Sequence, residues 1–130
     1  MAAGKYSFTI EQGATVDFEI AYKDSNGNPI NLTGYQARMQ LRPSPGSDIL
    51  YLTLSSSLKA DGTGLNLSGS GGLKPPTSGT IGVYISAVSS SQLNFDLVSY
   101  DLEIASSNDV VTRLLEGKVK LSQEITEGLY

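Results

Sequence analysis

The sequence predicts an all-β protein, an antiparallel β-sandwich of about eight strands that forms one domain over residues 1–130. Apolar and polar residues alternate with a period of two along most of the chain. Turn-forming residues separate these alternating runs at regular intervals. The helical signal covers about one turn. A small closed β-barrel made from the same strands is the alternative.

Alternation locates most of the strands in order. The turn Gln12-Gly13 separates the first two, and the loop 24–29 precedes the third. The run 49–54 is apolar nearly throughout, so we expect it to be covered on both faces. The expected strands are 6–10, 16–20, 35–42, 49–54, 65–67, 81–85, 100–104 and 110–121. The expected core comprises Phe8, Ile10, Phe18, Ile20, Met39, Leu41, Val83, Ile85, Tyr100, Leu102 and Ile104.

The connecting segments differ in character. Ser86 to Leu93 begins with a serine and carries small residues, which predicts a single helical turn. Ser55 to Gly79 is the longest irregular stretch, and its segment Gly69-Ser70-Gly71-Gly72 is typical of a flexible loop tip. The last strand is long, and a bulge at Gly117 would bend it.

Composition limits the function. The chain has no cysteine and no histidine, which removes disulfides, thiolate or imidazole metal ligands and His-based catalysis. The net charge is −4, whereas a nucleic-acid-binding protein usually has an excess of basic residues. No apolar run is long enough to span a membrane, and the N-terminus lacks the apolar region of a secretory signal. We therefore expect no enzyme, no cofactor, no small-molecule substrate, no nucleic acid and no membrane partner.

The loop at Asp24, Asn26 and Asn28 has the spacing of the first calcium ligands of an EF-hand. Pro29 and Tyr35 stand where that motif needs glycine and glutamate. Asn, Asp and Gly all favour turns for reasons of their own backbone. We therefore expect a turn here and no metal site.

Two pairs of charged residues alternate along expected strands. Arg38 and Arg42 lie on one face, and Asp101 and Glu103 lie on one face of another strand. The acids could bridge to the arginines, or the arginines could belong to an interface, where Arg is enriched. Nothing near the two acids suggests catalysis. The candidate interface residues are Arg38, Arg42, Gly69, Ser70, Gly71, Gly72, Leu129 and Tyr130.

Several of the strand sequences together resemble a known family. They are Leu32-Thr33-Gly34 leading into the strand that ends at Arg42, then Tyr100-Asp101-Leu102-Glu103, then Leu115-Glu116-Gly117-Lys118-Val119, and finally Glu124-Ile125-Thr126. This order resembles the immunoglobulin-like N-terminal domain of baseplate upper and fibre-attachment proteins of tailed bacteriophages. The resemblance spans nearly all of the chain.

The resemblance implies an immunoglobulin-like sandwich that serves as a structural protein of the virion, in the baseplate, the neck or a tail adaptor. It implies self-assembly into a homo-oligomer, docking of other virion proteins, and assembly in the host cytoplasm. Larger members carry a C-terminal receptor-binding region, whereas this chain ends at Tyr130, which favours a scaffold or adaptor role. The alternatives are a capsid-decoration protein and a module that binds host-surface carbohydrate, for which Tyr51 or Tyr130 would have to lie exposed beside a cleft.

Overall fold

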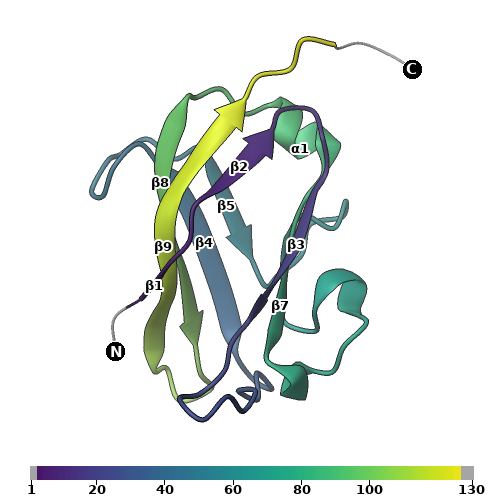
Figure 1. The fold of residues 1–130 in the computed structure, drawn as a ribbon, viewed down its shortest axis with the longest axis vertical. Coiled ribbons are helices and arrows are strands. Elements are labelled where there is room, and N and C mark those ends of the chain that lie inside the picture. Colours follow the sequence, from purple (N-terminus) through teal and green to yellow (C-terminus); the bar gives the residue numbers. More distant parts are fainter. Residues whose placement is uncertain (1–2, 127–130) are drawn as a thin grey trace.

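Two β-sheets packed face to face form the protein (Figure 1). The structure, a computed structural model, describes residues 3–126. Strands make up 44% of it and helices 9%. The strands are β1 (Gly4–Lys5), β2 (Phe8–Glu11), β3 (Val16–Ala21), β4 (Gln36–Arg42), β5 (Leu52–Ser55), β6 (Gly64–Asn66), β7 (Thr80–Ile85), β8 (Leu97–Ala105) and β9 (Val111–Ser122). The helical turns are η1 (Ser70–Gly72), η2 (Pro76–Ser78) and α1 (Ala87–Ser91).

The larger sheet contains six strands in the order β1-β9-β8-β4-β5, with β2 also paired to β9. The smaller sheet contains three strands in the order β3-β7-β6. Both N-terminal strands run parallel to β9, and all other pairs are antiparallel. The chain crosses between the sheets after β2, β3, β5 and β7. The predicted sandwich is confirmed, and the strands described do not close into a barrel.

Alternating burial along the strands builds the core between the sheets. In β8 every second residue from Val98 to Ile104 is buried, as the sequence pattern predicts. Eight of the eleven expected core residues are buried. Phe8, Phe18 and Ile20 are half-buried instead, because β2 and β3 lie at the edges of their sheets. The two phenylalanine rings pack against each other with centroids 5.1 Å apart.

The N-terminal strand is split where it passes Gly117 of β9. A Cβ at this glycine would lie 2.1 Å from the carbonyl oxygen of Tyr6, so only glycine allows the approach. The hydroxyl of Tyr100 donates to the same carbonyl at 2.5 Å. The expected bulge at Gly117 is wrong, since the register of β8 and β9 shifts between Leu102 and Glu103 instead.

Two loop predictions are also corrected. The segment 49–54 is not covered on both faces: Ile49 and Leu50 are exposed, and β5 is an edge strand that begins at Leu52. The expected flexible tip at residues 69–72 packs instead on the outer face of the small sheet, where Gly69 is buried. A Cβ at Gly82 would lie 2.7 Å from the backbone of that loop.

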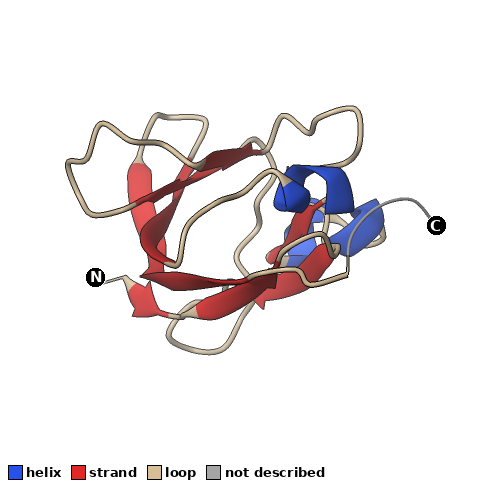
Figure 2. Cartoon of the chain, turned by 90° about the horizontal axis from the view of Figure 1, so that it is seen from above, coloured by secondary structure: helices blue, strands red, loops and turns tan. Residues whose placement is uncertain are grey.

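The expected helical turn is confirmed as α1, which lies on the same side of the molecule as β3 of the small sheet (Figure 1). Figure 2 shows the helical turns grouped on one side of the molecule. Ser86 caps α1 by accepting a hydrogen bond from the backbone of Ser89 at 3.1 Å. The hydroxyl of Ser86 in turn donates to Asp61 at 2.6 Å. With the backbone N–H of Thr63, this bond lowers the pKa of Asp61 to about 2.

Candidate functional site

The outer face of the large sheet carries three rows of polar side chains that cross the strands. The strand register places outward residues of β4, β8 and β9 side by side. We call the first the basic row; it consists of Arg42, Ser99 and Lys118. The two mixed rows consist of Lys5, Gln40, Asp101 and Glu116, and of Arg38, Glu103 and Arg113.

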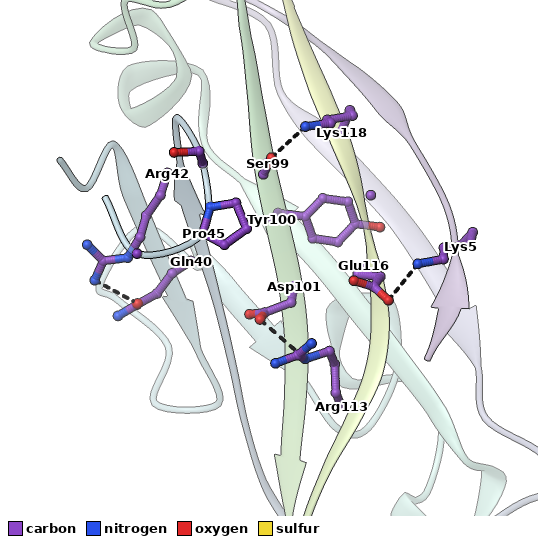
Figure 3. A pocket seen from close by; sticks show the side chains of 13 residues that line it. Lys5, Gln40, Arg42, Pro45, Ser99, Tyr100, Asp101, Arg113, Glu116 and Lys118 are labelled. Carbon is purple, nitrogen blue, oxygen red and sulfur yellow. Dashed lines mark hydrogen bonds and ion pairs between the residues drawn. The ribbon is translucent and has the colours of Figure 1, made fainter. Parts of the chain in front are cut away.

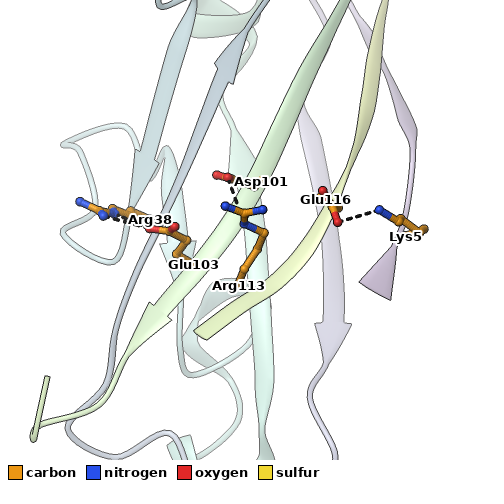
Figure 4. A network of polar contacts seen from close by, with 6 residues as sticks. All are labelled: Lys5, Arg38, Asp101, Glu103, Arg113 and Glu116. Atoms are coloured by element: carbon orange, nitrogen blue, oxygen red, sulfur yellow. Dashed lines mark hydrogen bonds and ion pairs between the residues drawn. The ribbon is translucent and has the colours of Figure 1, made fainter. Parts of the chain in front are cut away.

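Ion pairs neutralise the charges of the mixed rows, as Figure 4 shows. Each acid has a cationic partner on a neighbouring strand, and the three cationic side chains are largely exposed. Exposed pairs of this kind contribute about 0–1 kcal/mol each. The pairs are Arg38–Glu103 at 2.9 Å, Arg113–Asp101 at 3.5 Å and Lys5–Glu116 at 2.6 Å.

The two central acids differ in environment. Lys5, which donates a hydrogen bond to Glu116, lowers the pKa of that carboxyl. Partial burial, together with the nearby charge of Glu103, raises the pKa of Asp101. Both groups belong to the ion-pair network.

The basic row has no such neutralisation. Arg42 donates to the carbonyl oxygen of Ser47 at 2.9 Å and to the amide oxygen of Gln40 at 3.0 Å. Lys118 donates to the hydroxyl of Ser99 at 2.8 Å. Within residues 3–126, neither cation has a carboxylate within 4.0 Å. The two cations of the basic row therefore lie on this face without an acidic partner (Figure 3).

The loop after β4 turns this region into an open groove of about 620 Å³. Ser44, Pro45 and Gly46 form one wall, and the outward residues of β8 and β9 form the floor. The bond from Arg42 to the Ser47 carbonyl holds the loop in place. The arrangement offers an anion-attracting surface to an acidic group of a partner.

Positive charge is concentrated on this face of an acidic protein. Six of the nine cationic residues point outward from the large sheet, together with four acids. The remaining described residues hold three cations and eight acids. The cations on the face are Lys5, Arg38, Arg42, Arg113, Lys118 and Lys120, and the acids are Glu11, Asp101, Glu103 and Glu116.

The structure unites only part of the predicted site. Arg38 and Arg42 share the outer face of β4, as predicted, but only Arg38 bridges to an expected acid. Gly69, Ser70, Gly71 and Gly72 lie on the small sheet instead, on the other side of the sandwich. Leu129 and Tyr130 fall outside the described residues.

Sequence reasoning missed Ser99 and Lys118. Both alternate with buried residues on their strands, which marks them as outward-facing. Their position beside Arg42 depends on strand order, which alternation does not reveal. The signal that could have pointed to Lys118 is the cluster of three outward cations in β9, Arg113, Lys118 and Lys120.

The loop at Asp24, Asn26 and Asn28 forms the expected turn, in which Asp24 accepts hydrogen bonds from the backbones of Asn26 and Asn28, both at 2.9 Å. In the part of the chain that the structure describes, no three acidic side chains gather as a metal site would require. Among the same residues, no helix has the length and apolar character needed to cross a membrane.

Compared with known proteins, the chain matches no family model and no curated sequence.

Proposed function

We propose that the chain is a structural subunit of a tailed-phage virion that works by docking other proteins on the outer face of its large sheet. The observation that carries this proposal is the basic row, in which Arg42 and Lys118 remain without acidic partners beside an open groove. Fixed cations that lack an acidic partner lower stability slightly through mutual repulsion, so a binding role accounts for Arg42 and Lys118 better than a folding role.

The resemblance of the strand sequences to phage baseplate and fibre-attachment domains supports the virion assignment, and the sandwich agrees with the fold that this resemblance implies. The site supports docking over catalysis, because three of the four acids of the face, Asp101, Glu103 and Glu116, are engaged in ion pairs. The proposal places the protein in the baseplate, the neck or a tail adaptor.

Purified particles of the phage that encodes the chain test the virion assignment. Mass spectrometry of particles banded in a density gradient should detect the chain, and gold-labelled antibodies should mark one region of the tail. A chain found only in the soluble lysate, and absent from particles, would contradict the proposal. A capsid-decoration role would appear as label over the head.

A carbohydrate-binding module is the second candidate, and Tyr51 is the observation that favours it. This tyrosine lines a groove of about 520 Å³ beside β5 and α1. However, its ring packs against Phe95 with centroids 5.0 Å apart, so only part of the ring remains available to a sugar. Binding of the chain to a glycan array, lost in Tyr51→Ala, would favour this function over docking.

A further inference from the structure

A further groove, of about 320 Å³, lies on the outer face of the small sheet. Its walls include the carboxylates of Asp17 and Asp61, the amide of Asn66 and the ring of Tyr84. Asp17 and Tyr84 are direct neighbours across β3 and β7. Carboxylates and the face of an aromatic ring both attract positive charge, so this acidic groove suits a cationic side chain.

The local hydrogen bonds keep the groove acidic and ordered. Ser70 donates from its hydroxyl to one carboxylate oxygen of Asp17, and no described residue donates to the other oxygen. Asp61 accepts bonds from Ser86 and Thr63, which fix the carboxylate against the start of α1. The groove is therefore preformed, which reduces the entropic cost of binding.

The basic row is the complement of this groove. Arg42 and Lys118 carry charge that no described carboxylate neutralises, and they lie on the outer face of the opposite sheet. The two surfaces face away from each other across the sandwich, so they cannot meet within one chain. They can meet between two chains.

We propose that copies of the chain associate head to tail, with Arg42 and Lys118 of one copy binding the acidic groove around Asp17, Asp61 and Tyr84 of the next. This inference rests on the docking role proposed above and names a second copy as the partner. A contact between two different faces is heterologous, so it continues into a ring or a filament. Positive charge is concentrated on the outer face of the large sheet, and the rest of the described chain is acidic. This distribution favours a second copy of the chain as the partner over an unrelated protein.

Sedimentation velocity of the purified chain tests the association directly. At about 0.05 M salt we expect concentration-dependent oligomers, and at about 0.5 M salt we expect them to dissociate, because screening weakens contacts between exposed charges. A chain that stays monomeric at low salt and high concentration would overturn the inference. Oligomers that are insensitive to salt would also overturn it.

Charge reversal tests whether the basic row makes the contact between copies. The double variant Arg42→Glu with Lys118→Glu should weaken association by roughly tenfold or more, because two attractive contacts become repulsive. The control, Lys23→Glu with Lys59→Glu, makes the same change in net charge at exposed positions that line neither surface. Equal weakening in both double variants would contradict the inference, since it would reflect net charge alone.

The acidic groove needs its own variant. Asp17→Asn with Tyr84→Leu removes the free carboxylate charge and the ring, and should weaken association to a similar extent. Tyr84→Phe keeps the ring and should associate like the original chain. Asp48→Asn removes an exposed charge that lines neither groove and should have little effect. Circular dichroism of each variant establishes that the β spectrum is unchanged.

Mixing the two defective double variants separates a head-to-tail contact from a symmetric one. The basic-row variant keeps an intact groove, and the groove variant keeps an intact basic row. Together they should form a dimer and stop there, because each chain supplies one functional surface. A mixture that remains monomeric, like each variant alone, would overturn the head-to-tail arrangement. These measurements use the isolated chain, so their failure is distinct from absence of the chain from virions.

Discussion

On the small sheet, the outer face of β7 is covered by the chain itself, whereas on the large sheet the outer face of β8 is open. Gly82 points outward from β7 and is nevertheless buried beneath the loop at Gly69 and Ser70. The corresponding outward residues of β8, Ser99 and Asp101, are only half-buried. The protein therefore covers part of one outer face, at Gly82, with its own loop, and leaves the middle of the other uncovered.

Side-chain size and charge explain the difference. Gly82 carries no side chain, so the backbone of the loop can approach to van der Waals contact. Glu19 then anchors the loop, because it accepts bonds from the backbone of Ser70 at 2.8 Å and from Lys74 at 2.9 Å. On the large sheet, long charged side chains occupy the outward positions, and a covering loop would have to remove them from water at considerable cost.

Truncating a core side chain should lower the free energy of unfolding more in the large sheet than in the small sheet, and this is the largest effect that we expect. Leu102 is fully buried in the middle of the large sheet, so Leu102→Ala should lower the free energy of unfolding by about 2–5 kcal/mol. Phe18 is half-buried at the edge of the small sheet, so Phe18→Ala should cost less. Urea denaturation measures both, and a larger loss at Phe18 would show that the small sheet carries more of the core than its burial indicates.

The covered face should be sensitive to added volume, and the open face should not. Gly82→Ala places a Cβ against the loop backbone, so we expect a loss of about 1–3 kcal/mol and faster proteolysis near residues 68–74. Ser99→Ala, at an outward position on β8, should change stability by less than about 0.5 kcal/mol. If Gly82→Ala proved neutral in both assays, the loop would not be held by the close approach that the structure shows.

Acid titration should affect Asp61, beside the small sheet, in a defined pH range. Its folded-state pKa of about 2 lies below the ordinary value of 3.8. The stabilisation is therefore fully present above about pH 5 and is lost as the pH falls through about 2. Asp61→Asn should lower the melting temperature at pH 7, and the difference from the original chain should shrink toward pH 2. A difference that stays constant over this range would contradict the assigned hydrogen bonds.

Much of the fold was predictable because its signal is local. Alternation in β4 and β8 reports which residues face the core, and it gave the correct faces for Met39, Leu102 and Ile104. The position of a strand within its sheet is not local. For this reason Phe18 and Ile20 have the expected orientation but only half the expected burial, since β3 has a neighbour on one side only.

The candidate site was less predictable, because it depends on contacts between distant segments. A segment rich in glycine and serine predicts flexibility, but residues 69–72 are ordered by Asp17 and Glu19, more than fifty positions earlier in the chain. The basic row likewise joins Arg42 to Lys118 through β8. The alternation of apolar and polar residues could indicate which face of its strand each residue occupies. Only the order of the strands in the sheet shows that Arg42 and Lys118 lie in one row.

The ion pairs on the open outer face of the large sheet should contribute least to the free energy of unfolding. Their small contribution would contrast with the larger loss expected when the covered face of the small sheet is disturbed. In a double-mutant cycle of Arg38→Ala and Glu103→Ala, we expect a coupling of about 0–1 kcal/mol that decreases with salt. The arginine side chain is 69% exposed, so water competes for its charge and the pair gains little. A coupling well above 1 kcal/mol would mean that the mixed rows are part of what holds the sheet together, and that the face is maintained for stability. A weak coupling leaves binding as the better explanation for so many charges on one surface, because charges that add little to folding still steer and orient an approaching partner.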